Sequence, residues 1–366
     1  MTWRRRCWRS LRQYRRSSET IQIDLRSLLV GTSLKTLDSM HRRQFLATLG
    51  AGLIAKASPA LAQSPSRSYR LGTATPLAAI TATSRFGQIL ARTLAEQGYV
   101  VGENLIWDAH STDGNNARLP AIFDDFKKSR ADAVIVVGFQ TALAAKASGI
   151  PAVGAIGLGD PVETRLIESL KRPGGNLTGS SDDATMLTSK RLQLLKELSP
   201  ALRKVAMVWN ADDLGMTLRY NASARSAQAL GVHVQALGVR EPNDFEDAFS
   251  AMKQERPDAI LMIADGLTNL NRKRVFEFAA AEKLPAIYEY DFLARDGGLM
   301  SYGPDLTESF ERAAALVDRI FRGADPADIP FERPTRYPFL LNLNTARAIG
   351  IEVPPRLLAL ADEVIE

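Results

Sequence analysis

Short apolar stretches alternate with amphipathic stretches from about residue 68 to the end of the chain. The apolar stretch Val134–Val137 is unbroken, which is typical of a parallel strand that is buried on both faces. Along Met186–Leu198 the leucines recur at helical spacing, and Lys190, Arg191 and Lys196 take the opposite face. The pattern therefore predicts strands and helices in alternation, which indicates an α/β fold with doubly wound parallel sheets.

The expected elements follow from this alternation. Strands are expected at Tyr69–Thr73, Asn104–Ala109, Ala133–Val137, Ala152–Ile156, Val205–Trp209, His233–Leu237, Ala259–Ile263, Ala286–Tyr288 and Gly298–Tyr302. Helices are expected at Phe86–Gln97, Arg118–Lys128, Met186–Leu198, Leu218–Leu230, Phe245–Gln254, Arg272–Lys283 and Leu306–Phe321.

The series pauses at Asn176–Asp183 and starts again at Leu202, which predicts two lobes with a sheet each. The pause is rich in Gly, Ser and Asp and fits a hinge or crossover better than a regular element. Four prolines between residues 326 and 338 exclude a central strand there. That segment is expected to wrap between the lobes before Phe339–Leu343 and a terminal helix from Pro355.

The amino-terminal region predicts an export signal. Two arginines at 42 and 43 precede the apolar stretch Phe45–Ala55 and the small residues up to Ala62. The sequence predicts a signal peptide at 40–62, cleaved near Ala62-Gln63, of the twin-arginine type or of the ordinary secretory type. The stretch is shorter than the ~17–25 residues that span a bilayer, so no stable membrane insertion is expected. Residues 1–39 are interpreted as sequence upstream of a true start at Met40, or as a disordered basic extension.

Charge and composition exclude several classes of protein. The chain is 45% hydrophobic and 24% charged, which is ordinary for a globular protein. Its net charge is +5, yet residues 1–62 hold twelve of the 46 basic residues and three of the 41 acidic ones. The rest of the chain is therefore acidic overall, and no nucleic-acid partner is expected. One cysteine, Cys7, and three histidines predict no internal disulfide, metal centre or cofactor.

No catalytic motif is present. Gly154–Gly159 follows a predicted strand, but its GxxGxG spacing is the reverse of the dinucleotide-binding pattern. The acidic pairs Asp124-Asp125 and Asp212-Asp213 are interpreted as exposed helix acids and N-caps rather than as an acid/base pair.

Candidate ligand contacts follow the predicted strands, because ligands of doubly wound sheets bind beyond the strands' carboxyl ends. These segments are Thr73–Pro76, Gly138–Thr141, Gly157–Pro161 and Ala264–Gly266. Gly138 allows a close approach of the backbone, Gln140 and Thr141 offer donors, and Asp160 or Asp265 offers a partner for an ammonium group. Thr75, Thr141 and Asp160 are alternatively helix caps. Tyr288, Tyr290 and Tyr302 form an aromatic wall or pack in the core.

Several segments resemble the substrate-binding proteins of ABC transporters of the tryptophan/tyrosine-binding type. They are Gln97–Leu105, Gly159–Val162, Leu170–Gly179, Lys190–Glu197, Ser301–Pro304 and Asn342–Ala346. The resemblance covers about residues 68–366 and implies a type I periplasmic binding protein with three crossovers. It implies one lobe at 68–180 plus 303–332 and another at 181–302 plus 333–366.

The resemblance also implies where the ligand binds. In the first lobe the implied contacts are Thr75, Pro76, Gly138, Phe139, Gln140, Thr141, Asp160 and Pro161. In the second lobe they are Asp183, Trp209, Asn210, Asp265 and Tyr288. Phe139 and Gln140 stand where several relatives carry a small residue, so this chain departs from the family pattern at the expected carboxylate site.

The expected function is that of a monomeric periplasmic solute-binding protein that delivers its ligand to an ABC permease. The ligand is expected to be a small organic molecule, an amino acid or an aromatic compound, held between Phe139 and Tyr288. Two alternatives remain open, namely an enzyme that uses the same cleft and a ligand sensor for a signalling system.

Overall fold

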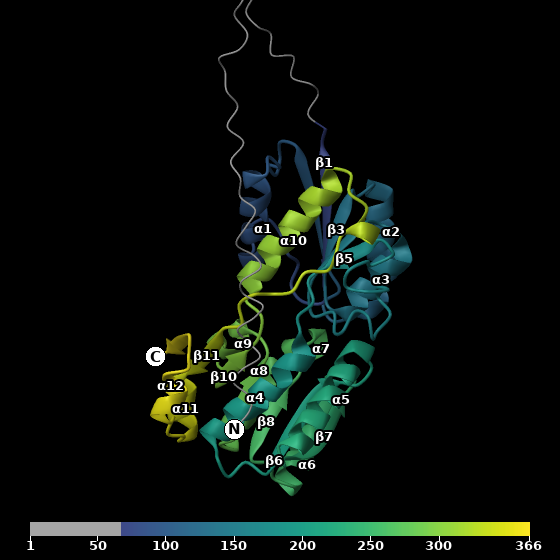
Figure 1. Cartoon of the computed structure of the whole chain (residues 1–366). Coiled ribbons are helices and arrows are strands. Elements are labelled where there is room, and N and C mark those ends of the chain that lie inside the picture. Colours follow the sequence, from purple (N-terminus) through teal and green to yellow (C-terminus); the bar gives the residue numbers. More distant parts are fainter. Residues whose placement is uncertain (1–66) are drawn as a thin grey trace, which may run out of the picture. The chain divides into compact units, whose positions relative to one another are not determined.

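The computed structural model describes residues 67–366, so the leader and extension predicted within 1–62 lie outside the described residues. The first lobe is built on a parallel five-stranded sheet of order β2-β1-β3-β4-β5 (Figure 1). Its strands are β1 (Tyr69–Thr75), β2 (Leu105–Ser111), β3 (Ala133–Val137), β4 (Ala152–Ile156) and β5 (Leu177–Gly179).

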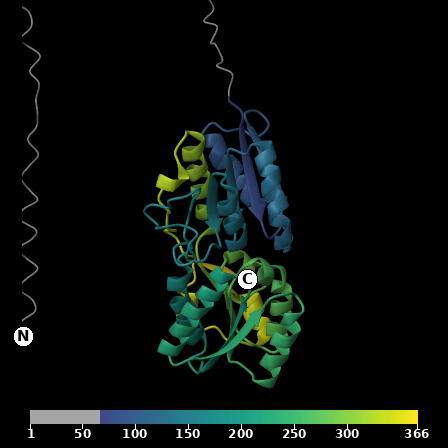
Figure 2. The same ribbon diagram turned by 90° about the vertical axis from the view of Figure 1, so that its right-hand side faces the viewer.

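Helices cover both faces of this sheet because its strands bury side chains on both sides. Ile135 of β3 packs with α1 (Arg85–Glu96) and α10 (Leu306–Phe321). The adjacent Val136 packs with α2 (Leu119–Ser129) and α3 (Phe139–Ser148). In Figure 2 the yellow-green α10 stands among the purple and blue elements, so this lobe combines segments far apart in the sequence.

The second lobe is built on a seven-stranded sheet of order β12-β11-β10-β9-β8-β6-β7. Its strands are β6 (Lys204–Asn210), β7 (His233–Val239), β8 (Ala259–Met262), β9 (Ala286–Tyr288), β10 (Met300–Tyr302), β11 (Phe339–Asn342) and β12 (Glu363–Ile365). Its longer helices are α4 (Ala184–Leu198) and α5 (Leu214–Ala229), which pack with one cluster of core side chains, and α6 (Asp244–Gln254) and α8 (Arg272–Ala281), which pack with another. Its short helices are α7 (Gly266–Leu270), α9 (Asp291–Arg295), α11 (Leu343–Ile349) and α12 (Pro355–Leu358). Two further short helices contact the first lobe, η1 (Asn116–Arg118) beside α2 and η2 (Pro326–Asp328) beside β5.

The predicted α/β fold with two sheets is confirmed, and each predicted strand and long helix has a counterpart. The second sheet is not wholly parallel, since β11 runs antiparallel to β10. The prolines lie outside the strands, as expected, and the chain enters β11 from that segment. The expected terminal helix is only the short α12, after which β12 joins the sheet beside β11.

Two other elements differ from the expectation. The pause at Asn176–Asp183 contains β5, an edge strand that pairs with β4. The segment after β3 is a helix, α3, whose first residue is the predicted site residue Phe139. Neither the short strand nor this largely apolar helix produces a clear period in the sequence.

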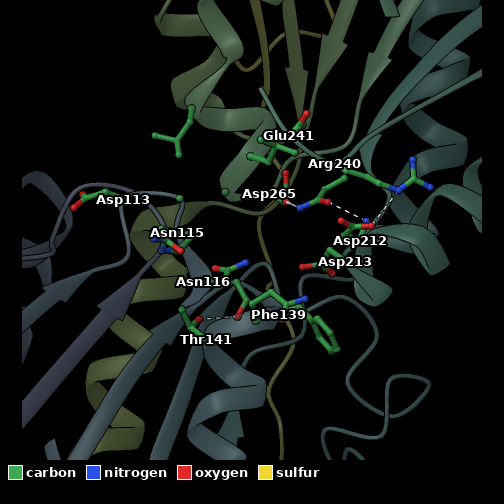
Figure 3. A pocket seen from close by; sticks show the side chains of 18 of the residues that line it. Asp113, Asn115, Asn116, Phe139, Thr141, Asp212, Asp213, Arg240, Glu241 and Asp265 are labelled. Carbon is green, nitrogen blue, oxygen red and sulfur yellow. Dashed lines mark hydrogen bonds and ion pairs between the residues drawn. The ribbon is translucent and has the colours of Figure 1, made fainter. Parts of the chain in front are cut away.

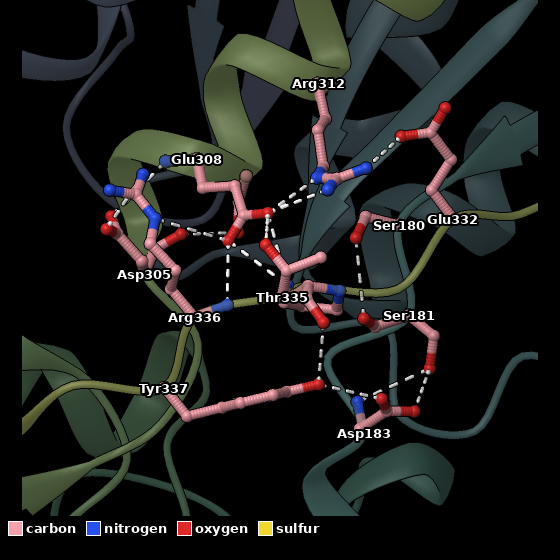
Figure 4. A network of polar contacts seen from close by, with 12 residues as sticks. Ser180, Ser181, Asp183, Asp305, Glu308, Arg312, Glu332, Thr335, Arg336 and Tyr337 are labelled. Atoms are coloured by element: carbon pink, nitrogen blue, oxygen red, sulfur yellow. Dashed lines mark hydrogen bonds and ion pairs between the residues drawn. The ribbon is translucent and has the colours of Figure 1, made fainter.

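The chain passes between the two sheets three times, from β5 to α4, from β10 to α10 and from η2 to β11. The first and third passages are tied together by polar contacts (Figure 4). Ser180 pairs with Glu332 as an isolated parallel bridge, and the Tyr337 hydroxyl donates to Asp183 Oδ2 at 3.0 Å. The exact residue boundaries of the lobes stay a prediction.

Glu308 of α10 binds the third passage shortly before β11. Burial alone would raise the pKa of Glu308, but hydrogen bonds from Thr335 and Arg312 lower it to about 2. The Thr335 hydroxyl lies 2.6 Å from Oε1, and Arg336 N lies 3.0 Å from Oε2.

We expect Glu308 to stabilise the fold at neutral pH and to lose that effect in acid. A lowered pKa means that the contribution is present above the unfolded value of 4.5 and is lost as the pH falls toward 2. Urea unfolding at pH 6 and pH 2.5 should show that Glu308→Gln costs about 2 kcal/mol at the higher pH and clearly less at the lower one. An equal cost at both values would contradict this account.

Candidate functional site

Two adjoining cavities lie between the lobes, at the carboxyl ends of β1, β3, β6 and β8. Chamber 1 has a volume of about 510 Å³ and chamber 2 of about 470 Å³. The residues that line both chambers are Pro76, Val137, Gly138, Asp265, Gly266 and Leu270. The two chambers are therefore parts of one cleft, within the size range of sites that bury small organic ligands.

Beside the chambers the two lobes lie close together at positions where one of them has a glycine. A Cβ on Gly266 of the second lobe would lie 2.6 Å from Cβ of Pro76 in the first lobe. A Cβ on Gly215 at the start of α5 would lie 3.3 Å from Phe139 Cγ and 3.4 Å from the Leu158 carbonyl oxygen. Larger side chains at these positions would push the lobes apart.

Chamber 1 contains the start of α3 on the first-lobe side. Gly138 precedes this helix with φ of 89°, a value that favours glycine, and no side chain caps the first turn. The Thr141 hydroxyl turns back to the carbonyl groups of Val137 and Gly138 and lies 2.8 Å from the latter (Figure 3). The first peptide N–H groups of α3 have no acceptor within the helix, so they are suited to a ligand oxygen.

The second lobe supplies carboxylates to chamber 1. Asp213 caps α5 by accepting from Met216 N at 3.1 Å, and Asp265 caps α7 by accepting from Thr268 N at 2.9 Å. Asn210 Nδ2 donates to Asp265 Oδ2 at 2.6 Å. Burial, and then the nearby Asp265, raise the pKa of Asp213 to about 6. Burial also raises the pKa of Asp265.

Chamber 2 is largely apolar. Its apolar wall includes Leu77, Ile80, Phe86, Ile156, Phe292, Leu306 and Phe310. Tyr290 and Asn269 also belong to its lining, but the Tyr290 hydroxyl and Asn269 Oδ1 are themselves buried, and the hydroxyl faces the Arg219 guanidinium. Burial raises the pKa of Tyr290, so its hydroxyl stays protonated.

A buried ionic network lies behind chamber 2. The Glu289 carboxylate accepts from Arg191 Nη1 at 2.9 Å, from Arg219 Nη1 at 2.7 Å and from Ala264 N at 3.0 Å. Arg219 also pairs with Asp182 at 2.6 Å, and Arg191 Nε donates to the Tyr302 carbonyl oxygen at 2.7 Å. The network thus joins two interlobe passages to the residue that precedes Asp265.

Eight of the residues expected to contact ligand line the chambers: Thr75, Pro76, Gly138, Phe139, Gln140, Thr141, Asn210 and Asp265. Two of them differ in detail from the expectation. The Thr141 hydroxyl is held by its own helix, as described above. The Phe139 side chain is packed in the core of the first lobe, which leaves little of its ring to contact a ligand.

The other five, Asp160, Pro161, Asp183, Trp209 and Tyr288, line neither chamber. Asp160 is exposed and accepts from the peptide nitrogens of Val162 and Glu163, both at 2.9 Å, which is the capping alternative. Pro161 is buried in the same turn. Asp183 belongs to the first interlobe passage, where it binds Tyr337.

The two aromatic residues of this group are in the core. Trp209 stacks on Tyr220 with ring centroids 3.7 Å apart. Tyr288 is 1% exposed, packs edge to face on Phe276 and lines neither chamber, so it offers no surface for the ligand position expected between Phe139 and Tyr288. Tyr290, two positions along the chain, reaches chamber 2 instead.

Asp213 and Asn269 are among the chamber residues that the sequence-based site lacks. Asp213 is an N-cap, as predicted, but it is buried rather than exposed, and it lines chamber 1. Asn269 lies within α7, whose five residues are too few to show a helical period. No group of three or more His, Cys, Asp or Glu side chains suited to a metal ion is found within residues 67–366.

Comparison with known proteins agrees with this two-lobed architecture. A family model described as ABC transporter substrate binding protein matches residues 83–365. The chain belongs to this family. No helix within residues 67–366 has the length and apolar character needed to cross a membrane.

Among individual relatives, a tyrosine-binding protein of Clostridioides difficile is 24% identical over 263 residues, which is 71% of this chain and 75% of that protein. Two solved structures each match 81% of this chain over their whole length. One is a conserved domain protein from Vibrio cholerae, with 23% identity and a TM-score of 0.76. The other is an ABC domain in complex with L-Trp from Streptococcus pneumonia, with 21% identity and a TM-score of 0.73. These structures show the type I periplasmic binding protein fold for the substrate-binding protein described here.

Proposed function

We propose that this substrate-binding protein captures a small organic solute in the two-chambered cleft and delivers it to the permease of an ABC importer. The observation that supports this most directly is the cleft itself, which is lined by both lobes at the ends of their strands. A ligand that touches both lobes stabilises the closed arrangement, and the permease then recognises that arrangement. The signal peptide expected at 40–62 would place the protein in the periplasm. There it is expected to act as a monomer.

The ligand class is proposed from the chambers and from the relatives. One relative is described as tyrosine-binding and another as a complex with L-Trp, which favours a ligand with an aromatic body. The apolar wall of chamber 2 suits such a body. Pro76, Gly138, Gln140, Asn210 and Asp265 are the sequence-predicted residues that we propose as contacts.

Ligand-induced thermal stabilisation tests the function. A ligand that binds only the folded protein at a hundredfold excess over its Kd adds roughly 2.7 kcal/mol to the free energy of unfolding. Amino acids, amines, aromatic acids and sugars are screened in this way, and each hit is recovered after dialysis and analysed by chromatography. Stoichiometric recovery of unchanged ligand supports a solute-binding protein. Conversion of the ligand would favour an enzyme that uses the same cleft.

Closure of the lobes makes a separate prediction for Gly215→Val. The new side chain would meet Phe139 and the Leu158 carbonyl across the lobes, so the closed state becomes unfavourable. We expect ligand affinity to fall at least tenfold, which corresponds to about 1.4 kcal/mol. Small-angle scattering should show that ligand compacts the wild type more than the variant.

The matched control is Gly175→Val, because a Cβ on Gly175 has no neighbour within 4 Å. This control should bind ligand like the wild type. Unchanged affinity in Gly215→Val would show that binding does not require the approach of α5 to the first lobe.

A further inference from the structure

Two carboxylates of chamber 1 have no cationic partner. Asp213 is 3% exposed, and its side chain accepts from the neutral peptide nitrogen of Met216. Asp265 accepts from neutral groups of Asn210 and Thr268. Neither carboxylate forms an ion pair with any residue in the range 67–366. A buried carboxylate without a cation is costly, so these two side chains are suited to a positive group that arrives from outside.

The remaining charges of chamber 1 do not balance this pair. The chamber is lined by five carboxylates, those of Asp113, Asp212, Asp213, Glu241 and Asp265, and by one guanidinium, that of Arg240. Arg240 pairs with Asp212 at 3.2 Å, where both side chains are mostly exposed at the rim (Figure 3). The buried arginines Arg191 and Arg219 are already paired with Glu289 and Asp182.

Chamber 2 supplies the apolar part of the site. Its wall includes Phe86, Phe292 and Phe310. The arginines of this chamber are engaged, since Arg85 pairs with Asp291 at 3.0 Å and Arg272 with Asp296 at 2.8 Å. Chamber 2 therefore offers an apolar surface and no uncommitted cation for a ligand carboxylate.

We propose that the cleft selects an aromatic amine bound as a cation, with its ammonium group at Asp213 and Asp265 and its ring in chamber 2, and that a carboxylate on the ligand weakens binding. This inference rests on the proposed solute-binding function and names its ligand class. Asp265 borders both chambers, so one small molecule can reach the carboxylates and the apolar wall together. The peptide N–H groups of α3 remain available to a neutral oxygen.

The test compares ligands that share a ring and differ in charge. Isothermal titration calorimetry with tryptamine, tryptophan and indole-3-propionate, and with tyramine, tyrosine and 3-(4-hydroxyphenyl)propionate, separates the ammonium group from the carboxylate. We expect each amine to bind at least tenfold more tightly than its amino acid, and the acids to show no binding.

The carboxylates are tested with Asp213→Asn and Asp265→Asn. Asparagine caps a helix as well as aspartate does, so these variants remove charge and keep the caps. Each should weaken the amine at least tenfold. The control is Asp124→Asn on α2, which lies outside both chambers and is exposed. Circular dichroism checks that each variant folds. If a variant does not fold, the order of the affinities of amine, amino acid and acid for the wild-type protein decides whether the amine preference holds.

The outcomes separate this inference from the proposed function. Tighter binding of the amino acids than of the amines would overturn the amine preference and leave the solute-binding function standing. Binding of amines that is unchanged in both Asp variants would overturn the proposed ammonium position. If none of the six compounds binds, the aromatic-amine inference is wrong. The broader screen described above then decides whether the solute-binding function fails with it.

Discussion

Glu289→Ala is expected to lower the free energy of unfolding by about 3–5 kcal/mol, because it leaves two buried arginines without the carboxylate that they share. Glu289 and Arg191 are each 1% exposed, so water does not compensate for the lost partner. Arg219 keeps Asp182 at 2.6 Å, whereas Arg191 keeps only the carbonyl oxygen of Tyr302. The peptide nitrogen of Ala264 also loses its acceptor.

Urea unfolding of the ligand-free protein at pH 7 measures this loss. The control is Glu277→Ala, an exposed position on α8, which should change the free energy of unfolding by less than about 0.5 kcal/mol. A loss below about 1 kcal/mol in Glu289→Ala would mean that the guanidinium groups find other partners or water. The expected loss would instead show that the passages near Asp182 and Tyr302 depend on this single carboxylate.

The ionic network also shows where sequence-based prediction stops. The leucines of α4 give a period that predicts one buried face, and Leu194 and Leu195 are buried. Arg191 lies on the opposite face, yet it is buried as well, because that face packs against Glu289 and the β10–α10 passage. A hydrophobic period identifies the face that meets the apolar core. It does not reveal a second contact that is ionic.

The candidate site could be predicted only in part for a related reason. The rule that ligands bind beyond strand ends selected Asp160 and Asp265 equally, since each carboxylate caps the turn or helix after its strand. Only the arrangement of the sheets decides that Asp265 lines the cleft and that Asp160 does not. Tyr288 and Tyr290 differ in the same way, because β9 ends at Tyr288 within the core and the chain then turns toward chamber 2.

Asp213→Asn is expected to stabilise the ligand-free protein by roughly 2–3 kcal/mol at pH 8. Burial is the main cause that raises the pKa of Asp213 to about 6 from 3.8, and Asp265 adds to it, whereas Met216 N and Arg219 oppose it. A raised pKa means that the protonated carboxyl favours the fold at low pH. That advantage is full below the unfolded value and is lost as the pH rises through about 6.

Asparagine is neutral at every pH and still caps α5. The variant therefore keeps at pH 8 the stability that the wild type loses when the Asp213 carboxyl ionises. Urea unfolding at pH 8 should therefore show the gain, and at pH 4 the two proteins should be nearly equal. Asp124→Asn should leave stability unchanged at both values. A loss of stability in Asp213→Asn at pH 8 would mean that the charged carboxylate already has a favourable partner without ligand. The expected gain, together with weaker binding of the amine, would show that Asp213 is kept charged and buried for its ligand at the expense of the fold.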